Sequence, residues 1–312
     1  MEYLTLSHSD LRVSRLCLGG CPMGGHGWGE VQEQELLAAV HAALDGGVTF
    51  FDTADVYGLG QSERLLGKAL AARRHEVVIA SKFGVCVGQG ATRYDNSPDY
   101  IRKALEGSLQ RLHTDYLDLY QLHYRDGVTP LTEVCETLEQ LRQEGKIRYF
   151  GLSNIQEKDF DELSSLADRF VSVQDEYSLA CRKHERELQV LRDQFGLTPL
   201  TWGSLGQGIL TGKYGREVTF ASNDRRSREV YVNFHGEKLL RNLEIVEAMR
   251  PLAQAYGKSV AAVAIRFILD YLHESVVLVG AKRPDQVHGN VDALDWHLAP
   301  HDVAHLEELS RE

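Results

Sequence analysis

Short strand-like segments alternate with amphipathic helical segments eight times along this chain, and few folds accommodate that pattern. Strands joined by helices of this length run parallel and are connected by right-handed crossovers. Eight such units in 312 residues predict an α/β chain folded as a (β/α)8 barrel, the TIM-barrel architecture. A doubly wound open sheet is the alternative that periodicity alone leaves. The predicted strands are residues 15–19, 49–53, 76–81, 116–122, 147–152, 171–174, 198–202 and 275–279.

The helical segments between these strands carry apolar residues three and four positions apart. Residues 33–45, 131–141 and 259–272 each place such residues on one stripe. Ser97 and Pro98 mark a helix start, because Ser is a favoured N-cap and Pro is favoured at the first helical position. These segments supply the outer layer that a barrel requires.

Two further segments lie outside the repeat. Residues 3–6 and 11–17 flank a polar turn and predict an N-terminal β-hairpin. A long gap follows the seventh strand, and its polar, Gly-rich part at 206–231 predicts a long loop over the barrel mouth. The charge run at 223–229 is alternatively a plain solvated surface. Without repeats or low-complexity segments, we expect one domain over residues 1–312.

Composition restricts the partners and the compartment. Lys and Arg number 34 against 45 Asp and Glu, a net charge of −11, which disfavours nucleic acid and anionic membranes as partners. No apolar run approaches the roughly 18 residues of a membrane span, and no signal peptide is visible. Five scattered cysteines, among them Cys17 and Cys21, lack the second pair of a zinc site. We therefore expect a cytoplasmic protein without a metal; nothing in the sequence indicates its oligomeric state.

Four polar residues fall at the carboxyl ends of consecutive predicted strands, which meet at one rim of a barrel. Asp52 and Tyr57 follow the second strand, Lys82 the third and His123 the fourth. An ammonium beside a tyrosine lowers its pKa from about 10, a carboxylate holds the ammonium, and a histidine can orient a substrate oxygen. Taken singly, each has a structural alternative, such as a surface lysine or a packed tyrosine. Together they predict a general acid for an oxygen that becomes negative as a hydride arrives.

The same positions carry motifs that resemble the aldo-keto reductase family, and the resemblance runs in order over essentially the whole chain. It implies a (β/α)8 barrel that binds NADPH, or less often NADH, without a Rossmann domain. It also implies reduction of aldehydes and ketones, or the reverse oxidation of alcohols. The matching segments are Phe51–Gly58, Gln61–Glu63, Leu66–Gly67, Ser81–Gly84, Asp115–His123, Gly145–Asn154, Gly208–Tyr214 and Gly280–Arg283, followed by Gln286 and Asn290.

The resemblance implies a role for each catalytic candidate. Tyr57 is the general acid or base, and Lys82 lowers its pKa. Asp52 holds Lys82, and His123 orients the substrate carbonyl.

The cofactor site also follows from the resemblance. Ser153, Asn154 and Gln174 match residues that bind the nicotinamide carboxamide, and Tyr177 matches an aromatic residue that stacks on its ring. Cationic side chains suit a ribose 2′-phosphate, so Lys282 favours NADP(H), with NAD(H) as the alternative; Arg283 either joins it or faces water. The remaining predicted cofactor contacts are Leu205, Gly280, Gln286 and Asn290.

The substrate pocket is predicted from the loops that follow the strands. Candidates are Trp28, Tyr94, Tyr124 and Arg125. Arg125 could anchor a carboxylate or phosphate or lie at the surface, and Trp28 could simply pack its loop. Aromatic walls suit a sugar-like carbonyl or alcohol, but they are common in small-molecule pockets.

Two other functions are compatible with the same barrel. One is a cofactor-sensing regulatory or binding subunit, and the other is a redox epimerase that recycles its cofactor internally. The presence of all four catalytic candidates favours an NADP-dependent carbonyl reductase or alcohol dehydrogenase.

Overall fold

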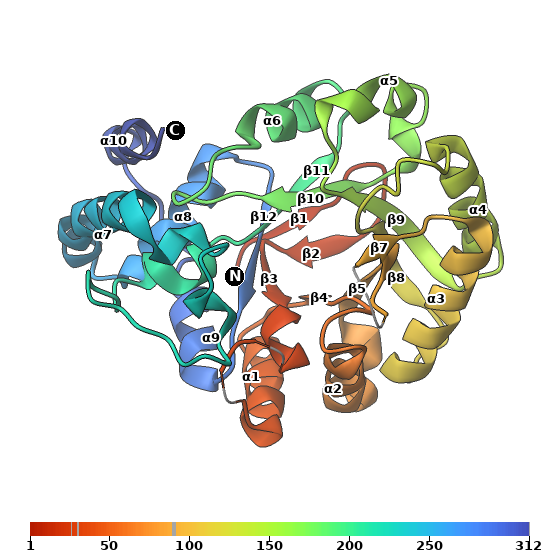
Figure 1. Cartoon of the computed structure of the whole chain (residues 1–312), viewed down its shortest axis with the longest axis horizontal. Coiled ribbons are helices and arrows are strands. Elements are labelled where there is room, and N and C mark those ends of the chain that lie inside the picture. The colour runs from red at the N-terminus through yellow and green to blue at the C-terminus, as the bar shows by residue number, and fades with distance from the viewer. Residues whose placement is uncertain (26, 30, 89–91, 312) are drawn as a thin grey trace.

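The computed structural model describes residues 1–25, 27–29, 31–88 and 92–311, and within them eight parallel strands close into a barrel. The last barrel strand pairs with the first, with Leu278 opposite Cys17, and this closure excludes the open sheet (Figure 1). The predicted (β/α)8 barrel and all eight predicted strands are confirmed. In chain order the strands are β3 (Leu16–Gly19), β4 (Phe50–Asp52), β5 (Val78–Phe83), β8 (Leu117–Leu122), β9 (Ile147–Ser153), β10 (Ser172–Glu176), β11 (Thr198–Trp202) and β12 (Val276–Gly280).

Helices surround the barrel strands, as Figure 1 shows. The helix predicted from Ser97 begins at Pro98, and the Ser97 hydroxyl caps it by accepting a hydrogen bond from the Tyr100 amide at 3.4 Å. The α-helices are α1 (Glu33–Asp45), α2 (Gln61–Leu70), α3 (Pro98–Leu112), α4 (Leu131–Gln143), α5 (Phe160–Leu163), α6 (Glu185–Asp193), α7 (Gly236–Tyr256), α8 (Val260–Tyr271), α9 (Pro284–Val291) and α10 (Pro300–Ser310). Short 3-10 helices are η1 (Cys21–Gly24), η2 (Ala71–Glu76), η3 (Glu157–Asp159), η4 (Ala167–Arg169), η5 (Gly206–Thr211), η6 (Arg225–Ser227) and η7 (Val232–Phe234).

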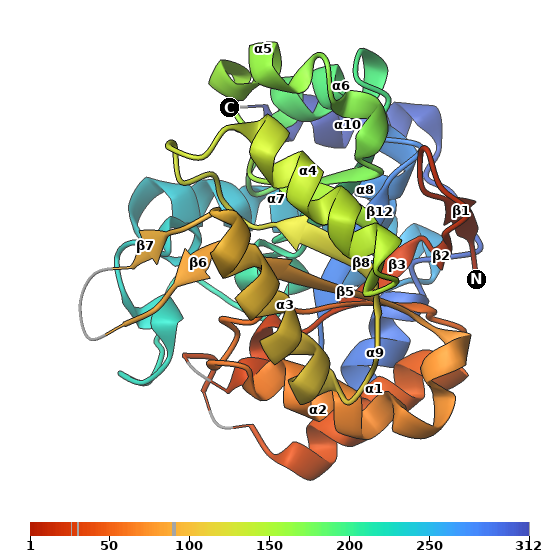
Figure 2. The ribbon, with the colours of Figure 1, turned by 90° about the vertical axis from the view of Figure 1, so that its right-hand side faces the viewer.

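The two ends of the barrel are closed differently. The predicted hairpin forms from β1 (Tyr3–Thr5) and β2 (Arg12–Ser14), although its second arm is shorter than expected because residues from Leu16 onward join the barrel as β3. Its side chains Leu6 and Leu11 pack into the cluster that fills the barrel interior. Figure 2 shows this hairpin at one end of the molecule and the carboxyl ends of the barrel strands directed toward the other. Because Leu6 and Leu11 close the first end with apolar side chains, a polar site can form only at the second end.

Loops and short elements border that second end, the mouth. A hairpin of β6 (Val85–Cys86) and β7 (Arg93–Tyr94), which the sequence analysis did not anticipate, lies between β5 and α3. The long segment after β11 is present as predicted, and it contains η5, η6 and η7 before α7 begins. Its charge run is not solvated throughout, because Asp224 is buried and pairs with Arg226 at 2.6 Å.

No single helix in the described part of the chain is long and apolar enough to cross a membrane. The bent pair α7 and α8, which meet at 93°, passes that test by length and composition alone.

Helix α2 packs so closely on the end of α3 that one glycine is required between them. A Cβ on Gly67 would lie 2.6 Å from the Leu112 carbonyl oxygen, whereas a Cβ on Gly289 in α9 would meet nothing within 4 Å. We expect Gly67→Ala to lower the free energy of unfolding by about 1–3 kcal/mol through overpacking. The matched change Gly289→Ala should be neutral or raise it by up to about 1 kcal/mol. Denaturant unfolding of both variants checks this, and equal effects would contradict the described packing.

Candidate active site

A buried ion pair lies at the centre of the mouth. The Lys82 ammonium contacts Asp52 Oδ1 at 2.5 Å, and both side chains are almost fully removed from solvent. Lys82 also donates hydrogen bonds to the Thr53 carbonyl at 2.9 Å and to the Tyr57 hydroxyl at 3.4 Å. The structure therefore brings Asp52, Lys82 and Tyr57 into one hydrogen-bonded chain.

Strand register produces this arrangement. Asp52 is the last residue of β4 and Lys82 the fifth of β5, and the two strands pair in parallel with Asp52 opposite Ala80. The second carboxylate oxygen of Asp52 accepts hydrogen bonds from the amides of Gln121 at 3.0 Å and Gln174 at 2.9 Å. Side chains from β4, β5, β8 and β10 thus form one polar layer above the apolar barrel interior.

The surroundings of Tyr57 favour its protonated form. Burial raises the pKa of Tyr57 well above its ordinary value, and Cys21 and Asp52 add to that shift. The Lys82 ammonium acts in the opposite sense, because a nearby positive charge favours the phenolate. Since the phenol oxygen accepts a hydrogen bond from Lys82, its own proton is directed elsewhere. The loop turns sharply after it: Gly58 has φ +60°, and a Cβ there would lie 2.1 Å from the Gly24 carbonyl oxygen.

His123 follows β8 and faces the same site. Its ring meets the Tyr57 ring edge-on, with 6.0 Å between centroids. Burial first, and then the Lys82 charge, lower the pKa of His123 well below its ordinary value, so the imidazole is neutral at physiological pH. Its Nδ1 has no hydrogen-bond partner among the described residues. A neutral imidazole can donate one hydrogen bond to a substrate oxygen without adding charge.

The predicted carboxamide-binding residues adjoin this layer. Asn154 Nδ2 donates to Ser153 Oγ at 3.0 Å and to the His123 carbonyl at 3.0 Å, and Ser153 Oγ donates to the Gln174 carbonyl at 2.8 Å. Asn154 adopts φ +55°, a left-handed conformation that Asn tolerates better than most residues. The three side chains form a connected polar edge beside Asp52, suited to a primary amide.

The structure does not bring Tyr177 to the mouth. Its ring is fully buried outside the barrel interior, stacked toward Tyr271, and its hydroxyl donates to Glu185 at 2.8 Å. An aromatic side chain that does face the mouth and was not predicted is Trp202, the last residue of β11, which packs on the interior cluster and stays partly exposed. Sequence reasoning missed it, although the period-two alternation that directs Leu200 inward also directs Trp202 inward.

Three cationic side chains, those of Lys282, Arg226 and Lys213, lie near one another. Lys282 is half-buried, donates to the Trp28 carbonyl, and has its pKa lowered by burial and by the nearby charges of Arg226 and Lys213. Gln286 accepts a hydrogen bond from the Lys282 amide at 2.8 Å, and Asn290 is buried on the same helix. This donor set fits a phosphate group, because charge-assisted hydrogen bonds to phosphate are strong. Sequence reasoning had not included Arg226 or Lys213.

The other predicted cofactor contacts take different positions. Arg283 is half-exposed and pairs with Asp285 at 3.0 Å, so it faces solvent. Gly280 ends β12, where a Cβ would lie 2.7 Å from the Pro22 side chain, and Leu205 lies directly before η5. Gly280 is thus a point of close approach at the strand end.

The predicted substrate residues divide into two groups. Tyr124 stacks on His123 with 5.0 Å between ring centroids, and the Tyr94 ring packs at a tilt against Tyr124 with 5.3 Å between centroids. The backbone of Trp28 forms an isolated antiparallel β-bridge with Asp224, and its ring lies beneath the Arg225 guanidinium. Arg125, however, pairs with Glu162 at 2.8 Å. That ion pair occupies Arg125 and does not present it to a substrate.

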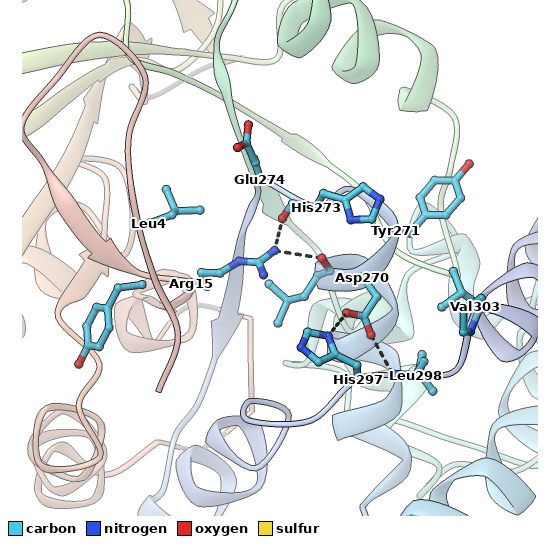
Figure 3. Close-up of a pocket in the computed structure, with 12 residues that line it drawn as sticks. Leu4, Arg15, Asp270, Tyr271, His273, Glu274, His297, Leu298 and Val303 are labelled. Atoms are coloured by element: carbon cyan, nitrogen blue, oxygen red, sulfur yellow. Dashed lines mark hydrogen bonds and ion pairs between the residues drawn. The ribbon is translucent and has the colours of Figure 1, made fainter.

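A cavity of about 740 Å³ lies at the opposite end of the barrel, between β1, the end of α8 and the start of α10 (Figure 3). Arg15 donates to the carbonyls of Leu269 and His273, and His297 Nδ1 lies 2.7 Å from Asp270. Arg15, directly after the hairpin, joins that segment to α8, and His297 joins α8 to the segment before α10. None of the four catalytic candidates lines this cavity.

Fold and site together define a barrel protein with a tyrosine, lysine, aspartate and histidine at the carboxyl ends of its strands. Comparison with known proteins identifies the family: the model named Aldo/keto reductase family matches residues 15–311. The chain belongs to the aldo/keto reductase family, a family of oxidoreductases. In the described residues, no group of three or more His, Cys, Asp or Glu side chains could hold a metal ion.

Individual relatives cover nearly the whole chain. Aldo-keto reductase YhdN of Bacillus subtilis is 34% identical over 312 residues, which span 99% of this chain and 93% of that protein. A probable voltage-gated potassium channel subunit beta of Oryza sativa is 34% identical over 305 residues, spanning 95% and 92%.

Solved structures of other proteins also match nearly the whole chain. Glycerol dehydrogenase AKR11B4 from Gluconobacter oxydans superposes with a TM-score of 0.89 at 33% identity, covering 98% of this chain and 94% of that one. An aldo-keto reductase from Klebsiella pneumoniae, solved in complex with NADPH, gives a TM-score of 0.77 at 30% identity and covers 99% and 96%.

Removing the lysine should expose the energetic role of the buried pair. We expect Lys82→Met to lower the free energy of unfolding by about 3–5 kcal/mol, because it leaves the Asp52 carboxylate buried without its cation. The control Lys68→Met breaks the solvent-exposed pair with Glu33, which is 2.6 Å long. That loss should be at most about 1 kcal/mol. Denaturant unfolding measures both, and a Lys82→Met protein as stable as the control would contradict the described burial.

Proposed function

We propose that this chain is an NADP(H)-dependent oxidoreductase that interconverts a carbonyl and an alcohol by hydride transfer, with Tyr57 as general acid and base. The observation that carries the proposal is the hydrogen-bonded chain from Asp52 through Lys82 to Tyr57, beside a neutral His123. Family membership supports the same class of chemistry. The carbonyl reductase and the alcohol dehydrogenase are the two directions of one reaction.

Each residue has one task in the proposed reaction. When bound, the nicotinamide supplies or accepts the hydride. Tyr57 donates its proton to the carbonyl oxygen as negative charge develops there, and the adjacent Lys82 ammonium stabilises the phenolate that remains. Asp52 holds that ammonium in place. His123 orients the same oxygen by a hydrogen bond, and alcohol oxidation reverses these proton movements.

The cofactor would lie across the mouth. Ser153, Asn154 and Gln174 would bind the carboxamide, and Trp202, rather than Tyr177, would stack on the nicotinamide ring. A 2′-phosphate would meet the cationic cluster around Lys282, which supports NADP(H) over NAD(H). The complex of the Klebsiella pneumoniae relative with NADPH supports that preference.

The substrate would be a small carbonyl or alcohol, with sugars and polyols as the class to test first. Tyr94 and Tyr124 offer aromatic faces near His123, and Trp28 offers another beside Arg225. Arg125 is left out because its ion pair occupies it. The glycerol dehydrogenase activity named for the Gluconobacter oxydans relative supports a polyol. A reducing, cytoplasmic location belongs to the proposal, supported by five cysteines of which no two form a disulfide bond.

Tyr57→Phe tests the assignment of the acid. Removing one hydroxyl should reduce turnover by at least about a hundredfold, the contribution of a positioned acid, and leave NADPH affinity nearly unchanged. NADPH oxidation with a panel of aldehydes, ketones and sugars measures turnover, and protein fluorescence quenching measures binding. Normal turnover by the variant would contradict the role of Tyr57. A wild-type protein that binds NADPH but turns over nothing would favour a regulatory subunit instead, and cofactor retained through many turnovers would favour a redox epimerase.

Lys282→Met tests the choice of cofactor. Losing a charge-assisted contact to the 2′-phosphate should weaken NADPH by about tenfold or more and leave NADH nearly unchanged. Arg283→Met is the control, because Arg283 already pairs with Asp285 at the surface. Dissociation constants of both cofactors, measured by fluorescence without substrate, report the effect. An unchanged NADPH to NADH affinity ratio in Lys282→Met would place the phosphate elsewhere.

A further inference from the structure

The loop that carries Tyr57 also carries a carboxylate that the proposed reaction does not use. Asp55 lies two residues before Tyr57 on the connection from β4 to α2. Its carboxylate accepts a hydrogen bond from the Val56 amide, on the same loop. Its Oδ1 atom is buried and has no hydrogen-bond partner among the described residues. Buried carboxylate oxygens are normally paired, so this one needs an explanation.

A cation that acts on Asp55, Arg111, already pairs with another carboxylate, that of Glu63. The Arg111 guanidinium on α3 contacts Glu63 of α2 at 2.6 Å, and Glu63 also accepts a hydrogen bond from Ser81 Oγ at 2.6 Å. Arg111 packs directly on the loop, since a Cβ on Gly60 would lie 2.4 Å from the Arg111 side chain. Glu63 therefore pairs with the Arg111 guanidinium, whereas Arg111 acts on Asp55 only through its charge.

The surroundings of Asp55 disfavour its charge. Burial first, and then the repulsion of Glu63, raise the pKa of Asp55 to about 7, while Arg111 and Lys82 act in the opposite sense. In return, the ionised carboxylate raises the pKa of Tyr57. The titratable and charged groups that face Asp55 are Glu63 from α2, Arg111 and Tyr100 from α3, Lys82 from β5, Tyr120 from β8, and Tyr57 from its own loop.

We propose that Asp55 is a positioning residue that sets the pH range over which Tyr57 exchanges its proton, an inference that rests on the proposed function. When Asp55 is protonated, no extra negative charge lies behind the phenol. When Asp55 releases its proton to solvent, its negative charge favours the protonated form of Tyr57. The ionised state then keeps Tyr57 in the form that protonates a carbonyl, and it opposes the phenolate that alcohol oxidation requires.

Asp55→Asn removes the charge and keeps the shape of the side chain. The pH at which alcohol oxidation by the variant reaches half its maximal kcat should fall, because the substitution removes one of the negative charges that raise the pKa of Tyr57. The alkaline loss of carbonyl reduction should shift by the same amount. Below about pH 6 the two proteins should behave alike, because wild-type Asp55 is then mostly neutral.

Asp175→Asn is the matched control. Asp175 on β10 is also buried, and burial likewise raises its pKa to about 7, but the charges near it are Glu176, Glu187 and Lys183. Its removal should leave the pH profile of oxidation in place. An Asp55→Asn profile that superimposes on wild type, or a uniform loss of kcat at every pH without a shift, would overturn the proposal.

A second measurement needs no turnover. The ultraviolet absorbance of phenolate is titrated in wild type and in Asp55→Asn, each with and without Tyr57→Phe, so that the differences isolate Tyr57. Earlier ionisation of Tyr57 in Asp55→Asn supports the proposal even if no substrate is found, and unchanged ionisation contradicts it. Absence of turnover in wild type would count against the proposed function alone.

Discussion

The mouth of this barrel is organised around one buried contact, between the Lys82 ammonium and the Asp52 carboxylate. Moving either ion alone out of water costs several kcal/mol, and their attraction offsets that cost only when the remaining donors and acceptors are also satisfied. Here they are: the ammonium reaches the Thr53 carbonyl and the Tyr57 hydroxyl, and the carboxylate accepts from two glutamine amides. The pair is therefore stable only as part of the complete layer, and four strands must hold their register to build it.

Strand alternation lets an apolar barrel end in a polar layer. On β8, the period of two that directs Leu119 into the interior cluster also directs Gln121 inward, one layer nearer the mouth. On β11 the same alternation directs Leu200 into the interior and Trp202, two residues later, inward at the mouth. The interior thus changes from aliphatic to polar and aromatic within one or two residues of each strand end. A proton-transfer site can form there without weakening the core beneath it.

Much of this could be predicted from the sequence, because the signals are periodic or lie at strand ends. The eight strands alternate regularly with helices, and the four catalytic candidates follow consecutive strands. Other features depend on partners distant in sequence. Arg125 pairs with Glu162, and Tyr177 lies one residue past an inward-facing position and so turns outward. Helix α7 was not assigned because its apolar residues do not form one stripe and Pro251 lies within it. The isolation of Asp55 likewise arises from α3, which brings Arg111 to Glu63 instead.

The distribution of charge around the mouth would allow the proposed anionic cofactor to bind an acidic protein. The chain carries a net charge of −11, which would repel a phosphate at long range. At physiological ionic strength, however, charges more than about 8 Å apart are largely screened, so the local set decides. Lys282, Arg226 and Lys213 lie together with Asp224 as their neighbouring acid, whereas Asp55 acts on Tyr57 and Glu63 acts on Asp55. Positive charge thus marks where a phosphate would bind. Negative charge, on Asp55, lies where it favours the protonated form of Tyr57. The same mouth could therefore attract a phosphate near Lys282 and still hold a neutral tyrosine as the proposed acid.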